Sequence, residues 1–497
     1  MAENHSPNKN NGITLLGLGP GTSGALTREA WIWLESIDQL LLRTIHHPVV
    51  AELPENLAVE SFDRFYETGQ EFSEVYQAII TEVLAKGEEP GGVTYAVPGH
   101  PFVLEATCPE IARRAIAAGI SVWVIDGLSF LEPTCSALGI DPFNGLILVD
   151  AMELGRRLTT GFPASSPALI GQIYSKQVAS EVRLILMTAY NDEHPVTLVH
   201  GAGTDKMQIK IMPLHQIDRT PNYGLVTSLY IPPRSKNASM EAFQEVIARL
   251  RAPDGCPWDR EQTHLSLRPF LLEEAYEALD ALDRGDQAAL QEELGDLLLQ
   301  IVLHAQIASE AGNFNLQDVL EGIGDKLVRR HPHVFSEVEV DGVTGVTRNW
   351  EAIKAAERTE HGGPERNGLL NGIPKALPAL IQADQVIERI SRVAFDHLTK
   401  QGDPGYLQAL FKKLEVTPDA QQSDLVGKLL LGLTSYAHQA GVDAESALRI
   451  ALARFREQFG EMEADALASG RSLGDISVSE KEQLWQEAGT KNSEDKA

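Results

Sequence analysis

The spacing of hydrophobic residues divides the chain into two parts. Over about the first 230 residues, short apolar runs alternate with stretches whose apolar residues recur at three and four. The runs predict strands and the stretches predict helices. The predicted strands are 13–19, 39–44, 93–99 and 121–127, and the helices between them include 73–87 and 105–119. Strands that alternate with helices favour an α/β unit with a largely parallel sheet.

Strand-like segments follow one another more closely between residues 127 and 233. They are 145–150, 167–174, 182–190, 196–203, 207–214 and 225–233. Because fewer helices separate them, we expect a second subdomain of the α+β kind with a mixed sheet.

Helical spacing dominates the rest of the chain. The segment 234–240 is polar and follows two prolines, which is typical of a linker. Beyond it Gly and Pro stand between long amphipathic stretches. The predicted helices are 239–251, 266–283, 286–311, 315–331, 345–358, 374–394, 404–415, 421–440 and 443–466.

The two patterns together predict a multidomain protein in which two α/β subdomains precede an all-α domain. A weak internal repeat lies within the all-α part, because 295–312 resembles 427–441. The second copy has Leu425 and Lys428 where the first has Glu293 and Asp296, so we expect it to be scaffold. The predicted limits are 12–126 and 127–233 for the subdomains, 234–240 for the linker, 241–395 for the helical domain, 396–475 for the degenerate second repeat and 476–497 for a flexible tail.

Composition and charge exclude several classes of function. The chain has 42 Lys and Arg against 70 Asp and Glu, a formal charge of −28. This balance argues against nucleic-acid binding, which depends on basic residues that neutralise phosphates. The three cysteines form no CxxC pair, and no apolar run is long enough for a membrane helix. We therefore expect a cytoplasmic protein that binds neither nucleic acid nor membrane.

Four carboxylates on two successive predicted helices form the clearest chemical pattern. Glu274 and Glu277 are three residues apart, and Glu293 and Asp296 repeat that spacing on the next helix. Residues three apart share a helix face, and a break at 283–285 lets the helices fold back on each other. A single ExxE pair usually marks a solvated face. Two facing pairs would repel each other unless a cation lies between them, and oxygen ligands suit Mg2+.

Basic and aromatic residues farther along suggest phosphate and base binding. Lys326, Arg329 and Arg330 share one helix face, as expected of a phosphate clamp, although one cation there could simply complement the helix dipole. Trp350 and Lys354 are four apart and could form a lid. A loop offers Trp258 and His264 for the nucleotide, although a Trp beside Pro is as often plain packing.

These motifs resemble the MazG family of all-α nucleoside triphosphate pyrophosphohydrolases. The resemblance rests on DGCPWDREQTH, EExxE followed by EELGD, KLVRRHPHVF and NWEAIKAAER, in that order between about 239 and 395. It implies Mg2+ ligated by Glu274, Glu277, Glu293 and Asp296, release of pyrophosphate and an intertwined homodimer. Lys326, Arg329 and Arg330 would offset charge on the departing pyrophosphate. Glu273 is a candidate general base, although on a helix it points about 100° away from Glu274.

The N-terminal half carries a second resemblance. A strand, a Gly-rich turn and a helix follow one another in LLGLGPGTSGALTREAW, and YAVPGHPFVLEAT and DGLSFLEPTCSALGID come later. Together they resemble the tetrapyrrole methylases, which bind S-adenosylmethionine between two α/β subdomains. The matching cofactor positions are Gly17, Gly19, Gly21, Pro98, Gly99 and His100. Methylases of this family usually carry Asp where His100 stands, and we find no nearby acidic replacement. The same change is familiar in fused methylase-like and MazG proteins of the YabN type, which the whole chain resembles.

The expected function is therefore Mg2+-dependent hydrolysis of nucleoside triphosphates to monophosphate and pyrophosphate, as housecleaning of the nucleotide pool. Two alternatives stay open. The chain could be an S-adenosylmethionine-dependent methyltransferase whose helical half serves dimerisation, or a nucleotide-binding regulator without turnover. The acidic quartet favours the hydrolase over the regulator, and His100 counts against the methyltransferase.

Overall fold

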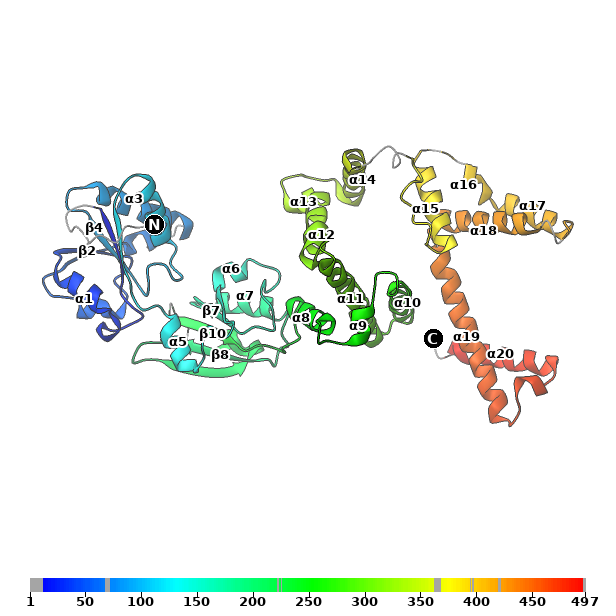
Figure 1. Ribbon diagram of the computed structural model, residues 1–497, viewed down its shortest axis with the longest axis horizontal. Coiled ribbons are helices and arrows are strands. Elements are labelled where there is room, and N and C mark those ends of the chain that lie inside the picture. The colour runs from blue at the N-terminus through cyan, green and yellow to red at the C-terminus, as the bar shows by residue number, and fades with distance from the viewer. Residues whose placement is uncertain are drawn as a thin grey trace. The chain divides into compact units, whose positions relative to one another are not determined.

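The computed structural model describes residues 12–67, 72–220, 223–224, 226–361, 368–393, 395, 397–418 and 422–494. The chain divides between Glu261 and Gln262 into two compact units, whose helices and strands are labelled in Figure 1. Within the described residues, no helix has both the length and the apolar character needed to cross a membrane.

The first α/β subdomain is built on a parallel sheet of order β3-β2-β4-β1-β5. Its strands are β1 (Ile13–Gly17), β2 (Gln39–Leu42), β3 (Ala58–Ser61), β4 (Val93–Val97) and β5 (Val122–Ile125). The parallel sheet and four of its strands confirm the sequence prediction. Strand β3 was not predicted, because it is an edge strand whose side chains are mostly exposed and show no apolar alternation.

Helices cover both faces of this sheet. Ile13 and Leu15 of β1 pack in one apolar core with α3 (Phe72–Glu88) and α4 (Thr107–Ala117). Leu16 points the other way, into a second core with α1 (Arg28–Glu35) and the 3-10 helix η2 (Pro48–Glu52). The sheet is therefore buried on both sides, as parallel sheets usually are. The short elements η1 (Ser23–Ala25), α2 (Asp63–Tyr66) and α5 (Leu131–Leu138) complete this part of the chain.

The second subdomain has a mixed sheet of order β6-β7-β10-β8-β9, as predicted. Its elements are β6 (Ile147–Asp150), α6 (Ala151–Gly155), β7 (Ala168–Gly171), α7 (Lys176–Leu186), β8 (Pro195–His200), β9 (Gln208–Pro213), η3 (Leu214–Arg219) and β10 (Thr227–Ile231). The strand predicted at 182–190 is wrong. Ser175 caps a helix there, and Val178, Val182 and Leu186 bury one helical stripe against the sheet.

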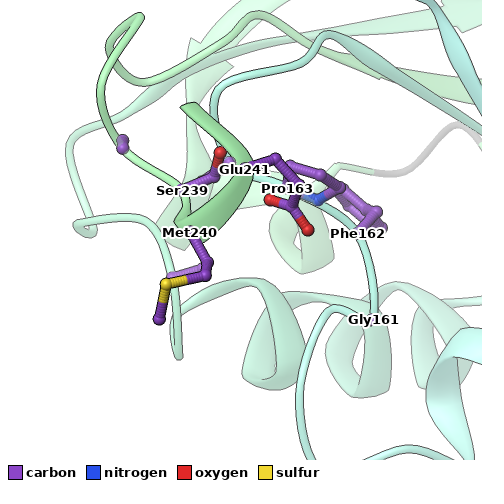
Figure 2. A pocket seen from close by; sticks show the side chains of 9 residues that line it. Gly161, Phe162, Pro163, Ser239, Met240 and Glu241 are labelled. Atoms are coloured by element: carbon purple, nitrogen blue, oxygen red, sulfur yellow. The ribbon is translucent and has the colours of Figure 1, made fainter. Parts of the chain in front are cut away.

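The segment after β10 is anchored to the second subdomain. The Arg234 amide donates to the Ala164 carbonyl at 2.8 Å, and the Ser165 and Ser239 hydroxyls lie 2.8 Å apart. Ser239 caps α8 (Met240–Arg251), which is followed by α9 (Pro257–Glu261). A cavity of about 360 Å³ opens between the loop 161–164 and the start of α8 (Figure 2). Glu241 is its one charged lining residue, and no predicted site residue lines it.

The second unit is helical, as predicted. Its helices are α10 (Arg268–Arg284), α11 (Gln287–Glu310), α12 (Leu316–Arg330), α13 (Pro332–Phe335), α14 (Gly342–His361), α15 (Ala379–Ser391), α16 (His397–Gln401), α17 (Pro404–Glu415), α18 (Gln422–Gln439), α19 (Ala444–Ala468), η6 (Leu473–Asp475) and α20 (Val478–Glu494). Every predicted helix in this unit is present. The short helices α13 and α16 were not predicted because they span only four and five residues.

The C-terminal segment corrects the sequence analysis. We predicted a flexible tail at 476–497, but α20 extends to Glu494 and contacts α19. The Trp485 ring lies 4.9 Å from the Phe455 ring between centroids, and Ala488 is fully buried. Gln458 Nε2 also donates to the Trp485 carbonyl at 2.8 Å. The contact of Trp485 with Phe455 thus helps to hold α20 against α19, although the charged sequence of this segment had indicated a flexible tail.

Candidate functional site

A tight connection brings the two acidic helices together. Gly285 ends α10 in the left-handed conformation (φ 67°), which a glycine adopts without strain. Asp286 then caps α11 by accepting from the amides of Ala288 and Ala289, each at 3.1 Å. The predicted break at 283–285 is thus a two-residue turn that folds α11 back along α10, with many contacts between them.

Three of the four predicted metal ligands meet across this helix pair. One carboxylate oxygen each from Glu274, Glu277 and Glu293 lies within 4.8 Å of the other two. Among the described residues this is the only group of three or more His, Cys, Asp or Glu side chains close enough to share an ion. The spacing of three on α10 brings both Glu274 and Glu277 into this group, whereas α11 contributes Glu293 alone, and metal binding by the four residues stays a prediction.

Electrostatics place Asp296 beside this cluster. Partial burial, followed by the charges of Asp296 and Glu277, raises the pKa of Glu274. The pKa of Glu293 is raised by partial burial and then by Glu277, Glu292 and Asp296. Like charges that raise each other's pKa favour a proton or a cation between them. Asp296 thus contributes to the negative charge around the cluster, although it is outside the group of three carboxylates that lie within 4.8 Å of one another.

The predicted basic and aromatic residues meet in a separate pocket. Lys326 and Arg330 of α12 and Trp350 of α14 line a cavity of about 330 Å³, together with Ile323, Leu327, His331, Val346 and Thr347. The Lys354 ammonium lies 3.4 Å from the centroid of the Trp350 ring, a cation–π contact. A pocket lined by the cations of Lys326 and Arg330 and by the Trp350 indole suits a ligand that has both an anionic group and an aromatic ring.

A carboxylate of the chain itself already binds the two predicted arginines. Arg329 donates to Glu357 Oε1 at 2.7 Å, and Arg330 donates to Glu357 Oε2 at 2.5 Å. Hydrogen bonds from Arg330 and then Arg329 lower the pKa of Glu357 to about 2. The two guanidinium groups therefore hold the carboxylate of Glu357, and a role for them in binding phosphate stays a prediction.

The remaining predicted residues of the helical half belong neither to the group of three carboxylates nor to the lining of the α12–α14 pocket. Trp258 is exposed on α9 in the first unit, and His264 lies near the start of the second unit. His264 pairs with His304, with their Nδ1 atoms 2.8 Å apart and their rings stacked at 6°. Glu273 is exposed on α10 and contributes to the raised pKa of Glu274. A role for each in substrate binding or proton transfer stays a prediction.

Glycines of the N-terminal half allow three strand ends to meet. A Cβ on Gly17 would lie 2.5 Å from the Gly127 amide nitrogen and 2.6 Å from the Gly99 carbonyl oxygen. Gly19 and Gly99 exchange backbone hydrogen bonds of 3.1 and 2.8 Å. Gly17 and Gly19 thus serve close backbone packing. Gly99 has φ 71° and no atom nearer than 3.9 Å to its Cβ position, so space lies beside it and the adjacent Pro98.

An acidic group, Asp126, lies beside His100, which corrects the expectation that there is none. His100 Nδ1 accepts from the Phe102 amide at 3.0 Å, so Nε2 carries the proton in the neutral ring. Nε2 lies 3.3 Å from Asp126 Oδ1. Asp126 follows strand β5, which is separated from β4 by β1 in the sheet, and only the fold brings it beside the loop after β4. Gly21 is also placed by the fold, since its Cβ would meet Thr204 Cγ2 at 2.8 Å.

Sequence reasoning missed several residues at these places. Glu357 is three residues after Lys354 and seven after Trp350, so helix spacing alone could have indicated it. Thr347 and His331 line the pocket without any distinctive pattern. Gly127 and Asp126 become visible only through the contact between strand ends.

Family comparisons agree with both halves of this description. The family described as Tetrapyrrole (Corrin/Porphyrin) Methylases matches residues 12–218, and the MazG nucleotide pyrophosphohydrolase domain matches residues 262–335. The chain is 37% identical over 486 residues to the uncharacterized protein YabN of Bacillus subtilis, covering 96% of this chain and 98% of that one.

Two further relatives match the helical half. The nucleoside triphosphate pyrophosphohydrolase/pyrophosphatase MazG of Thermotoga maritima is 37% identical over 249 residues, 50% of this chain and 94% of its own. The nucleoside triphosphate pyrophosphohydrolase of Escherichia coli is 37% identical over 252 residues, 49% of this chain and 94% of its own.

Fold and site thus define a methylase-like α/β unit joined to an all-α unit with a carboxylate cluster. The chain belongs to the MazG family of nucleoside triphosphate pyrophosphohydrolases, in the form fused to a tetrapyrrole methylase-like domain.

Proposed function

We propose that the protein hydrolyses nucleoside triphosphates to monophosphates and pyrophosphate with Mg2+ held by Glu274, Glu277, Glu293 and Asp296. The observation that carries the proposal is the meeting of three of these carboxylates within 4.8 Å, in the field of the fourth. The named activity of the Thermotoga maritima and Escherichia coli relatives supports it. Housecleaning of the nucleotide pool in the cytoplasm is the role we propose for this reaction.

The carboxylates fit Mg2+ by their chemistry and their charge. They are hard oxygen ligands, and the pKa values of Glu274 and Glu293 are raised by partial burial and then by repulsion from neighbouring carboxylates, which a divalent cation would relieve. When bound, Mg2+ would offset the negative charge of the triphosphate and favour attack by water. The residues would hold the ion and, by leaving part of its shell open, admit the phosphates.

Other residues would orient the substrate and balance its charge. Lys326 and Arg330 in the α12–α14 pocket would take the departing pyrophosphate, with Arg329 beside them. The Trp350 ring and the Lys354 ammonium, which already stack, would close over the nucleotide. The His264 side chain, in the same unit, would contact its base. Glu273 would accept the proton of the attacking water, if it turns toward the cluster.

A second copy of the chain fits the exposed apolar surface of the helical unit. Leu272 and Tyr276 of α10, Leu294 and Ile301 of α11, and Leu320 of α12 are between 42% and 52% exposed. Such a surface on three successive helices is typical of an interface. We propose a homodimer through the helical unit, in which the partner covers these side chains.

The N-terminal half offers a site for S-adenosylmethionine at the carboxyl ends of β1, β4 and β5. Ligands of open α/β sheets bind at this edge. The open space beside Gly99 supports binding there, whereas Gly17 and Gly127 are occupied by packing against each other. We propose cofactor binding without methyl transfer, and calorimetry with S-adenosylmethionine tests it directly.

Carboxylate variants test the hydrolase. Glu274→Ala and Asp296→Ala should abolish pyrophosphate release while the circular dichroism spectrum stays that of the wild type, because both side chains are partly exposed. Glu321→Ala on α12, an exposed glutamate outside the cluster, is the matched control. Substantial turnover in both carboxylate variants would contradict the metal assignment.

A further inference from the structure

The polar face that carries the carboxylates continues beyond them along α11. Gln300 lies one turn after Asp296, and His304 lies one turn after Gln300, so all three share one face of the helix. By the rise of an α-helix, Gln300 is about 6 Å and His304 about 12 Å from Asp296 along the axis. None of the roles in the proposed hydrolysis uses Gln300 or His304.

The pairing of α10 with α11 shows where this face points. Glu277 meets Glu293 in the carboxylate cluster, and His264, just before α10, meets His304. The sum of the two residue numbers is nearly constant along an antiparallel helix pair, and it is 570 for the first pair and 568 for the second. Gln300 lies between these two contacts in the same register. The row therefore runs along the α10–α11 seam from the carboxylates to the two histidines.

Two atoms of this row are buried without a partner. Gln300 is 5% exposed, and its Oε1 has no hydrogen-bond partner among the described residues. The same holds for His304 Nε2. Buried polar atoms are nearly always paired in native proteins, so an unpaired one calls for a ligand or another partner. Two of them in line with a proposed phosphate site indicate a ligand with polar groups beyond its phosphates.

The histidine pair lets His304 adapt to such a ligand. With the Nδ1 atoms 2.8 Å apart, one of them donates and the other accepts. Burial and the neighbouring His264 lower the pKa of His304, which favours the neutral ring. If His304 Nδ1 donates, its Nε2 accepts, and if Nδ1 accepts, Nε2 donates. A shift of one proton between the rings therefore changes which ligand group His304 can bind.

The degenerate second repeat lacks the same row. In the match of 295–312 to 427–441, Gln300 corresponds to Gly432 and His304 to Tyr436. A Cβ on Gly432 would lie 2.7 Å from the Gln401 carbonyl oxygen, so this position packs against α16. Tyr436 is 50% exposed. The copy that has lost Glu293 and Asp296 has thus lost the unpaired glutamine and histidine as well, which links the row to the carboxylates.

We propose that Gln300 and His304 bind the hydrogen-bonding edge of the nucleobase of a nucleoside triphosphate whose phosphates lie at the carboxylate cluster. The two residues determine base preference and take no part in the hydrolysis step. This inference rests on the proposed function, because it takes the position of the phosphates from it.

Binding measurements test the inference independently of turnover. Non-hydrolysable α,β-methylene analogues of four nucleoside triphosphates, and inorganic tripolyphosphate, are titrated with Mg2+ into the full chain by calorimetry. Gln300→Met and His304→Phe keep the side-chain volume but remove the hydrogen-bonding atoms. Gln306→Met, on another face of α11, is the matched control.

The wild type and Gln306→Met should prefer one base over the least favoured by about tenfold, the effect expected of a buried hydrogen bond. Gln300→Met and His304→Phe should bind the four analogues within about threefold of one another, with the affinity for tripolyphosphate unchanged. A wild type indifferent to the base would contradict the inference. So would variants that keep the wild-type preference or lose tripolyphosphate as well.

Two further results distinguish base recognition by Gln300 and His304 from a dimer contact and from the proposed hydrolysis. Conversion of dimer to monomer in Gln300→Met, seen by sedimentation, would mean that the unpaired atoms face a second copy, and would overturn the inference. Failure of the wild type to hydrolyse any triphosphate, with base-selective binding intact, would refute the proposed hydrolase but leave base recognition by Gln300 and His304 standing.

Discussion

Glu357 holds two guanidinium groups that a triphosphate would need. Its hydrogen bonds to Arg330 and Arg329, at 2.5 and 2.7 Å, are short and charge-assisted. Substrate phosphate would therefore have to displace a carboxylate of the chain itself. Glu357 on α14 would therefore compete with the substrate for Arg329 and Arg330 on α12.

The variant Glu357→Gln tests this competition. Removal of the negative charge should lower the dissociation constant for Mg2+-tripolyphosphate by about fivefold, the upper range for a partly exposed ion pair. Calorimetry with Glu321→Gln as control measures the change. Weaker binding in Glu357→Gln would mean that the carboxylate positions the arginines for phosphate rather than competing with it.

The pH dependence of this ion pair follows from the lowered pKa of about 2. A carboxylate with a depressed pKa stabilises the fold above its ordinary pKa, and that stabilisation is lost as pH falls toward the depressed value. We therefore expect hydrogen-exchange protection of α14 to be constant between about pH 5 and 9 and to fall below about pH 4. Loss of protection near neutral pH would contradict the assignment.

At the scale of elements, the α10–α11 pair is destabilised by its own charges when no metal is bound. A raised pKa means that the folded state takes up a proton more readily than the unfolded chain. The ionised Glu274 therefore costs stability above its folded pKa, and the cost disappears as pH falls through that value.

Melting temperatures test the charge on this helix pair. In EDTA at pH 8, Glu274→Gln should melt roughly 2 °C higher than the wild type, because one repelling charge is removed. Added Mg2+ should raise the melting temperature of the wild type more than that of Glu274→Gln. Equal responses of the two proteins to Mg2+ would contradict binding at this helix pair.

The second repeat should behave as scaffold. Leu425, at the position of Glu293, is 5% exposed and packs with Leu407, Leu410 and Leu429. Lys428, at the position of Asp296, is exposed and pairs with Asp424 one turn away at 2.5 Å.

Lys428→Ala should leave turnover unchanged, and Leu425→Ala should lower the free energy of unfolding by about 2–4 kcal/mol. A loss of turnover in Lys428→Ala, in a stable protein, would give this repeat a catalytic role.

Local patterns predicted most elements and the residue types of the site. Most helices of the second unit follow from periodicity, because each buries one stripe, and four strands of the first sheet follow from short apolar runs, because that sheet is buried on both faces. Patterns failed where tertiary packing decided the outcome. The run 182–190 is apolar enough for a strand but is largely helical, and α20 depends on the contact of Trp485 with α19. The closeness of Asp126 to His100 could not be predicted from local patterns, because it depends on how the strands are ordered in the sheet.

At the scale of the whole molecule, the helical unit leaves apolar side chains on three helices exposed. Leu272 of α10 and Leu320 of α12, 51% and 44% exposed, would lie in the proposed dimer interface. The full chain should sediment as a dimer, and Leu272→Asp with Leu320→Asp should sediment as a monomer, because buried unpaired charges are costly. The control is Val478→Asp, at an exposed apolar position on α20. A monomeric wild type would contradict the proposed interface.

Pyrophosphate release from a panel of nucleoside and deoxynucleoside triphosphates, with Mg2+ and with EDTA, decides whether the protein is a pyrophosphohydrolase. We expect Mg2+-dependent release of one pyrophosphate for each monophosphate formed, and none in EDTA. Silence across the panel from folded protein, or release of inorganic phosphate in place of pyrophosphate, would contradict this expectation.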